Sequence, residues 1–182
     1  MWNSRPVVAI LGSHKTPEDD EDYRQARLLG RMLARDNFVV CNGGYTGVME
    51  ASSRGASEMG GVTIGLTIAV FGDQGPNPYV TREIKHDTLF ERFANFVELS
   101  DAFVVFRGGM GTLAELSVIW NLMQTRALSR RPLIFVGECW PKVLECLREN
   151  LEVRDKDLRL VHMASSPEQA MEIIKEHVRV RP

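Results

Sequence analysis

Short apolar runs alternate along the chain with longer stretches in which apolar side chains recur at helical spacing. The runs are rich in β-branched residues and mostly continuous, which is typical of strands that are covered on both faces. The pattern predicts strands at residues 6–11, 38–41, 62–66, 102–106 and 132–136, with a further candidate strand at 158–162. It predicts helices at residues 18–35, 47–59, 88–99, 111–127 and 141–150, and a last helix that Ser166 caps and Pro167 begins.

This alternation is the pattern of successive βαβ units. It predicts an α/β fold: a single-domain, Rossmann-like, doubly wound structure whose mostly parallel sheet carries helices on both faces. Neither a repeat nor a linker interrupts the pattern, so residues 1–182 are expected to form one domain. The one long irregular stretch, 70–81, is either a plain surface connection or a pocket wall. Its expected place after a strand's carboxyl end, where α/β folds bind ligands, favours the pocket wall.

Composition narrows the possible partners. The chain is 44% hydrophobic and 25% charged, with a formal net charge of -2, so bulk charge gives no reason to expect nucleic acid or a membrane as a partner. Any anion must therefore be held locally. Cys41, Cys139 and Cys146 lack metal-ligand spacing, which disfavours a zinc site or disulfide framework. With no signal peptide or membrane span predicted, a cytoplasmic protein is expected.

The sharpest signal is the segment FVVFRGGMGTLAELSVIW. It passes from a strand through Gly108, Gly109 and Gly111 into a helix that carries Thr112 and Glu115. Glycines allow positive φ and a close approach to a ligand, and a helix start offers unpaired N–H groups and a positive dipole end, so a phosphate fits. The alternative is a capping box, in which Thr112 caps the helix and Glu115 reaches back to the Thr112 N–H.

Two further loops are expected at the same edge of the sheet. Gly43, Gly44 and Gly47 follow one strand and open a helix, while Gly12 and Ser13 follow the first strand. Backbone at these glycines can approach a ligand, and the Ser13 hydroxyl can donate to a ligand oxygen. The spacing matches neither the Walker A pattern nor the dinucleotide fingerprint, so ATP hydrolysis and NAD chemistry lose support.

One arginine is a candidate for the same pocket. Arg92 stands four residues after Thr88 on a helix that ends just before the strand leading to Gly108. Its guanidinium can hold phosphate or sugar oxygens with a planar fork of donors. The alternative is a solvated arginine that pairs with Glu91 or another nearby carboxylate.

Together these motifs resemble the LOG proteins, which are cytokinin riboside 5'-monophosphate phosphoribohydrolases long mislabelled as lysine decarboxylases. The resemblance rests on Gly-Gly-x-Gly-Thr-x-x-Glu at residues 108–115, on the glycines at 43–47 and on the Glu91-Arg92 pair. It implies a Rossmann-like subunit, usually dimeric, that cleaves a nucleoside 5'-monophosphate into free base and ribose 5-phosphate without an organic cofactor or metal.

The resemblance also implies roles for individual residues. The Gly108 loop and Thr112 would bind the phosphate, Arg92 and Glu115 would form the catalytic pair, and a dimer interface would border the pocket. The helix at 116–123 is apolar on more than one side, which fits either core packing or such an interface.

Two positions depart from the LOG pattern. Arg107 stands where the family usually has Pro, and Phe93 stands where it usually has Lys. Both changes alter the charge expected near the ligand, so the substrate can differ from a cytokinin nucleotide.

Two other functions would use part of the same sequence pattern. A non-catalytic carrier, similar to the molybdenum-cofactor carriers, would use the same loops, but the presence of both Arg92 and Glu115 favours an enzyme. Lysine decarboxylation would need a Schiff-base lysine in a cofactor pocket. The chain's lysines have no such sequence context: Lys15, Lys85, Lys142, Lys156 and Lys175.

Overall fold

The structure is a computed structural model that describes residues 2, 4–69 and 75–179. Its strands are β1 (Val7–Leu11), β2 (Val39–Asn42), β3 (Thr63–Ile68), β4 (Arg82–His86), β5 (Ala102–Val105), β6 (Leu133–Val136) and β7 (Val161–Ala164). Its helices are α1 (Glu21–Arg35), α2 (Val48–Glu58), α3 (Leu89–Leu99), α4 (Met110–Gln124), α5 (Cys139–Asn150), α6 (Asp155–Leu158) and α7 (Pro167–His177).

The strands form one sheet in the order β4-β3-β2-β1-β5-β6-β7, and every neighbouring pair is parallel. The chain builds outward from β1 to β4, returns to the other side of β1 as β5, and continues to β7. The chain therefore leaves β1 and β5 toward helices on opposite faces of the sheet. This change of direction marks the point where ligands bind in open α/β sheets. This architecture confirms the predicted Rossmann-like α/β fold.

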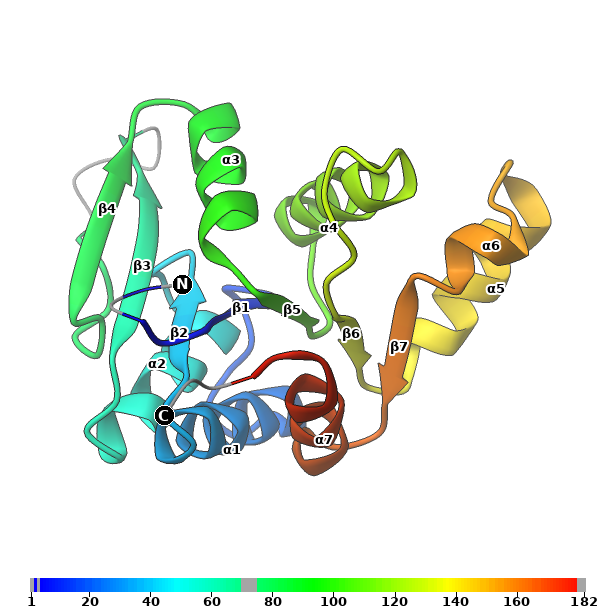
Figure 1. The fold of residues 1–182 in the computed structure, drawn as a ribbon. Coiled ribbons are helices and arrows are strands. Elements are labelled where there is room, and N and C mark those ends of the chain that lie inside the picture. The colour runs from blue at the N-terminus through cyan, green and yellow to red at the C-terminus, as the bar shows by residue number, and fades with distance from the viewer. Residues whose placement is uncertain (1, 3, 70–74, 180–182) are drawn as a thin grey trace.

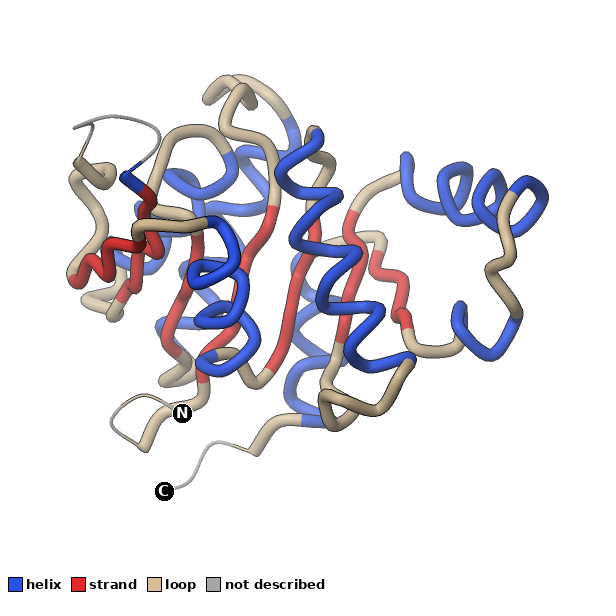
Figure 2. The backbone as a smooth tube through the Cα atoms, turned by 90° about the horizontal axis from the view of Figure 1, so that it is seen from above, coloured by secondary structure: helices blue, strands red, loops and turns tan. Residues whose placement is uncertain are grey.

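Helices cover both faces of the sheet. Figure 1 shows α1, α2 and α7 below it and α3 and α4 above it, and Figure 2 shows α3 and α4 lying across the strands from above. Strand β1 illustrates why its sequence is continuously apolar. Val8 and Ile10 pack with α1, α2 and α7, whereas Val7, Ala9 and Leu11 pack with α3 and α4, and all five are buried.

The strand predicted at 158–162 is wrong in its position. Residues Asp155–Leu158 form the short helix α6, and strand β7 begins only at Val161. A carboxylate oxygen of Asp157 accepts the Arg154 N–H at 3.1 Å, and the Trp120 indole donates to the Asp157 carbonyl at 2.9 Å. These polar contacts close a helical turn where the apolar pattern alone suggested a strand. The cap at Ser166, followed by Pro167, is confirmed.

Strand β4 has no counterpart in the sequence prediction. It pairs only with β3 at the edge of the sheet in the described residues, and Arg82, Glu83 and Lys85 are exposed. An edge strand with charged side chains carries no apolar run, so the pattern gave no signal for it. Before it, residues 70–74 of the irregular stretch lie outside the described residues. In the part that is described, the Asn77 amide donates to the carbonyls of Gly44 at 3.0 Å and Tyr45 at 2.9 Å.

Candidate active site

Backbone hydrogen bonds join the three loops at the carboxyl edge of the sheet. The Ser13 N–H, after β1, donates to the Arg107 carbonyl, after β5, at 3.1 Å. The Val48 N–H, at the start of α2, donates to the Ser13 carbonyl at 2.9 Å. The Gly12–Ser13 loop therefore lies between the other two, and the predicted convergence of the loops is confirmed.

Asn42, the last residue of β2, organises the second loop. Its buried amide nitrogen lies 3.0 Å from the Met49 carbonyl, 3.1 Å from the Ser52 hydroxyl and 2.9 Å from the Ser53 hydroxyl. Its amide oxygen accepts the Gly44 N–H at 2.8 Å. Asn42 was not among the predicted site residues, although a polar side chain at the end of an apolar run and directly before paired glycines is a usable signal.

The backbone conformation of the second loop explains why two of its positions are glycine. Gly44 has a φ of 82° and Gly47 a φ of 66°, in the left-handed region that side chains disfavour. A Cβ at Gly47 would also overlap the Ser13 carbonyl, and a Cβ at Gly12 would lie 2.6 Å from Val48 Cγ1. Glycine is required here so that the first two loops can lie against each other.

The third loop uses its glycines differently from the prediction. Gly108, Gly109 and Gly111 do not have positive φ, so that part of the expectation is wrong. Gly108 is needed because a Cβ there would overlap the Thr112 side chain, whereas a Cβ at Gly109 or Gly111 would meet nothing within 4 Å. Space for a ligand therefore lies over Gly109 and Gly111.

Helix α4 starts without a side-chain cap. It begins at Met110, and its N-cap Gly109 offers no side chain to the first N–H groups. The capping-box alternative for Thr112 and Glu115 is therefore wrong, since both residues lie inside the helix and both are buried. The open helix start leaves backbone donors and the positive dipole end for an anion.

Arg92 and Glu115 form a buried ion pair. Arg92 Nη1 lies 3.1 Å from Glu115 Oε1, with only 7% and 9% of the two side chains exposed. The alternative pairing with Glu91 is wrong, because Glu91 accepts the Thr88 N–H at 3.0 Å in the capping box of α3. The predicted juxtaposition of α3 and α4 residues is thus present in the fold.

Further contacts fix the position of Arg92. Its Nε donates to the Leu66 carbonyl of β3 at 2.6 Å, and its guanidinium carbon lies 5.3 Å from the centre of the Phe96 ring. A Cβ at Gly43 would overlap Arg92 Nη2. The guanidinium therefore occupies the space that Gly43 leaves, which brings the ion pair against the second glycine loop.

A family model described as the SLOG cluster4 family matches residues 5–171. The chain belongs to the SLOG cluster4 family. This match, together with relatives that carry the LOG activity in their names, confirms the resemblance to the LOG proteins.

Several relatives of the SLOG chain have names that describe an activity, and two of them represent the two activities named. The pyrimidine/purine nucleotide 5'-monophosphate nucleosidase of Escherichia coli K12 is 29% identical over 142 residues, covering 72% of this chain and 31% of the relative. The cytokinin riboside 5'-monophosphate phosphoribohydrolase of Mycobacterium tuberculosis is 34% identical over 116 residues, covering 58% of each chain. The SLOG chain thus spans less than two thirds of either relative.

A solved structure has a similar fold. The molybdenum cofactor binding protein of Rippkaea orientalis superposes with a TM-score of 0.76 at 25% identity, covering 94% of the SLOG chain and 96% of that protein. The same scaffold therefore occurs both in nucleotide-cleaving relatives and in a cofactor-binding protein, so fold alone does not assign the activity.

Burial dominates the electrostatics of the ion pair. It raises the pKa of Glu115 from 4.5 to about 7, against the opposing effect of the Arg92 charge. The Arg92 charge alone would lower this pKa, so burial outweighs it and the net shift is upward. Near neutral pH the carboxyl group is divided between its two protonation states. Cys41 is completely buried beside the pair, and burial raises its pKa, so it stays a thiol.

The two departures from the LOG pattern lie away from the ion pair. The Arg107 guanidinium makes salt bridges to Asp20 at 2.8 Å and Asp22 at 3.0 Å, at the start of α1. The added cation is thus neutralised. Phe93 lines an apolar groove of about 360 Å³ between α3 and α4.

No helix in the described part of the chain is long and apolar enough to cross a membrane.

The raised pKa of Glu115 predicts a pH-dependent stability. An unfolded glutamate ionises near pH 4.5, whereas the buried one resists ionisation until about pH 7. The free energy of unfolding should therefore fall as pH rises from 4.5 to about 7, by on the order of 3 kcal/mol. Urea denaturation of Glu115→Gln across this range should show a flatter curve than wild type.

The matched control is Glu172→Gln, which removes an exposed carboxyl group on α7. Its stability should follow the wild-type pH dependence. Parallel pH curves for wild type and Glu115→Gln would contradict the raised pKa.

Proposed function

We propose that this protein hydrolyses the N-glycosidic bond of a purine or cytokinin-like nucleoside 5'-monophosphate, giving free base and ribose 5-phosphate. The observation that carries the proposal is the buried ion pair between Arg92 on α3 and Glu115 on α4, because Glu115 lies on the same helix as the open N-terminal start of α4. Burying two charged groups costs free energy, because both are removed from water. A function for the pair accounts for that cost. The names of the two relatives support the same reaction.

The phosphate would bind at the start of α4. Gly108, Gly109 and Gly111 expose backbone donors, and the Thr112 hydroxyl supplies a side-chain donor. Thr112 and Glu115 are buried about one helical turn apart, roughly 5 Å along the axis. A ribose ring can bridge that length, so its anomeric carbon would come to Glu115 while the phosphate stays at the helix start.

The first two loops would enclose the rest of the nucleotide. Ser13 can donate its hydroxyl to a ligand oxygen, and Gly12 places it between the other loops. Gly43 brings backbone close to the Arg92 guanidinium without a side chain in between, and Gly44 and Gly47 supply the left-handed backbone of the same loop.

The chemistry would follow glycoside hydrolysis. As the bond from C1' to the base nitrogen breaks, the bonding electrons leave with the base and positive charge develops on the ribose. Ionised Glu115 stabilises that charge and takes a proton from the attacking water, whose oxygen bonds to C1'. Arg92 orients the carboxylate and the substrate, and the departing base gains a proton from solvent.

A carrier of a phosphorylated small molecule is the second candidate. The likeness to the Rippkaea orientalis protein favours it, because that protein is described as molybdenum cofactor binding. A carrier needs the phosphate loop but has no use for a carboxylate whose ionisation is set near neutral pH. The ion pair therefore makes the enzyme the better-supported function.

We also propose a homodimer whose interface borders the site. Phe90 on α3 is 83% exposed and Met110 on α4 is 80% exposed, and the apolar groove between the same helices contains Phe93 and Leu122. Because Arg92 and Glu115 lie on these two helices, a second copy seated on this face would close the site from outside. A cytoplasmic location remains a prediction.

The activity prediction concerns release of ribose 5-phosphate. Wild type should release it from one or more members of a panel that includes AMP and isopentenyladenosine monophosphate. Glu115→Gln keeps the side-chain size but removes the base, so the rate should fall by roughly 10² to 10⁴. Glu172→Gln should be as active as wild type. Phosphate-dependent binding without release from any substrate would favour the carrier instead.

The pH profile of the same reaction tests the role of Glu115. Because its ionised form acts and its pKa is about 7, kcat/KM should rise as pH increases and level off above that value. Residual activity of Glu115→Gln should lack this step. A rate that falls through the same range would assign Glu115 as a proton donor and contradict the proposed step.

The dimer is tested by changing the exposed aromatic residue. Phe90→Glu places a charge on the α3–α4 face and should shift the mass found by sedimentation toward the monomer. Leu151→Glu changes a side chain that is also exposed, near the end of α5, and should leave the mass unchanged. A monomeric wild type at working concentrations would refute the proposal.

A further inference from the structure

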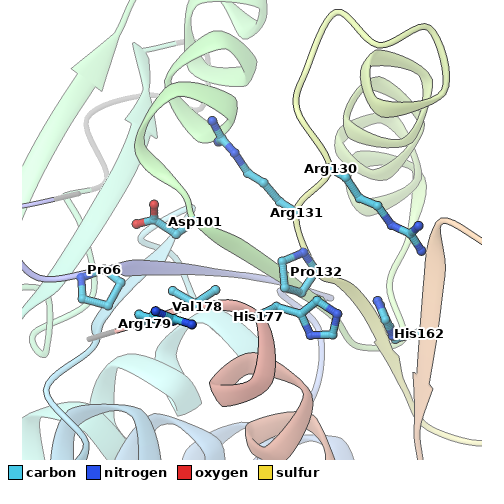
Figure 3. A pocket seen from close by; sticks show the side chains of 9 residues that line it. All are labelled: Pro6, Asp101, Arg130, Arg131, Pro132, His162, His177, Val178 and Arg179. Carbon is cyan, nitrogen blue, oxygen red and sulfur yellow. The ribbon is translucent and has the colours of Figure 1, made fainter. Parts of the chain in front are cut away.

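A pocket opens at the edge of the sheet opposite the glycine loops (Figure 3). It has a volume of about 550 Å³ and lies at the amino ends of the strands, away from the glycine loops. Pro6 precedes β1, Asp101 precedes β5, Pro132 precedes β6, and His177 ends α7. Its polar lining residues are Asp101, Arg130, Arg131, His162, His177 and Arg179.

Positive charge dominates this pocket. Three arginines line it but only one carboxylate does, and Asp101 already accepts the Val7 N–H at 2.9 Å. Within residues 2, 4–69 and 75–179, neither Arg130, Arg131 nor Arg179 makes a salt bridge. The protein as a whole is slightly acidic, so this is a local concentration of unneutralised charge.

Contacts with carbonyl groups hold two of the arginines in place. Arg131 donates to the carbonyls of Val97 and Ser100 at the end of α3, and Arg130 Nη2 donates to the Arg159 carbonyl at 2.8 Å. Cations are common at helix ends, so part of this arrangement stabilises the fold. A carbonyl cancels no charge, however, and each guanidinium has five N–H donors. The Arg130 guanidinium therefore keeps charge and donors for a ligand, whereas the Arg131 side chain extends toward the end of α3 (Figure 3).

Two histidines, His162 and His177, also line the pocket. The His162 and His177 rings meet edge to face with centres 5.0 Å apart. Burial lowers the pKa of His162, the charges of His177 and Arg130 act in the same direction, and the carboxylate of Glu176 acts against them. Figure 3 shows Arg179 on one side of His177 and Arg130 with His162 on the other. An anion between these groups would contact donors from several elements.

We propose that this pocket binds a small multivalent phosphate, such as a phosphate chain or a nucleoside polyphosphate, at a site separate from the catalytic edge. Guanidinium forks match phosphate oxygens in geometry and charge. The volume falls within the usual range of about 300 to 1,000 Å³ for small-ligand sites and exceeds what one phosphate group fills. The inference goes beyond the hydrolase function and does not depend on it.

Calorimetric titration at about 0.15 M salt tests the site, since that ionic strength screens diffuse surface attraction. The probes are inorganic tripolyphosphate and ATP. Wild type should bind at least one of them, and Arg130→Ala/Arg179→Ala should weaken that binding by about tenfold or more. Equal binding of both probes identifies the phosphate chain as the recognised part, and binding of ATP alone identifies a nucleoside polyphosphate.

Two further variants serve as controls. Arg24→Ala/Arg148→Ala removes two exposed arginines outside the pocket and should bind as wild type does. Gly111→Asp places a carboxylate at the open start of α4, which repels phosphate from the catalytic edge, and should also keep the binding. In wild type, the proton resonances of His162 and His177 should shift when the probe is added.

Three results would overturn the proposal. One is that neither probe binds to wild type. Another is that the Arg24/Arg148 control loses as much affinity as the Arg130/Arg179 variant, because the attraction would then be nonspecific. The third is that Gly111→Asp abolishes binding while Arg130→Ala/Arg179→Ala does not, since the phosphate would then bind only at the catalytic edge. None of these results depends on whether ribose 5-phosphate is released.

Discussion

The ion pair between Arg92 and Glu115 is the contact on which the arrangement of the carboxyl edge depends. Removing both groups from water is costly, and the attraction between them offsets that cost only if their remaining polar atoms are also bonded. The Leu66 carbonyl supplies one such bond, and the absence of a side chain at Gly43 supplies the space. Strand β3, helix α3, helix α4 and the second glycine loop must all be in place for this pair to form.

The two edges of the sheet offer different kinds of hydrogen-bond donor to an anion. At the carboxyl edge, backbone N–H groups at the start of α4 face open space, and the guanidinium groups of Arg92 and Arg107 are both paired with carboxyl groups. At the amino edge, helices end rather than begin, so backbone carbonyls predominate and arginine side chains provide the donors. This division follows from the parallel sheet, because every connecting helix runs from one edge back to the other.

The contacts of Arg107 and Phe93 explain what these two departures from the LOG pattern do in the fold. Arg107 does not add free charge to the phosphate loop, because Asp20 and Asp22 neutralise it and thereby tie the start of α1 to the end of β5. Phe93 contributes to the apolar groove between α3 and α4. Scaffold likeness to a cofactor-binding protein and sequence likeness to nucleotide-cleaving enzymes can coexist because function resides in a few side chains on a shared fold.

The sequence by itself determined the parallel α/β fold, since buried strands such as Val7–Leu11 and amphipathic helices such as Glu21–Arg35 carry strong local patterns. It also located the three loops and both members of the ion pair as candidates. Only the tertiary structure decided that β4 is a charged edge strand, that Asp155–Leu158 is helical, and that Asn42 organises a loop. It likewise decided that burial outweighs Arg92 in setting the pKa of Glu115. Edge pairing, long-range hydrogen bonds and desolvation depend on segments that are far apart in the chain. Local sequence patterns therefore do not predict them.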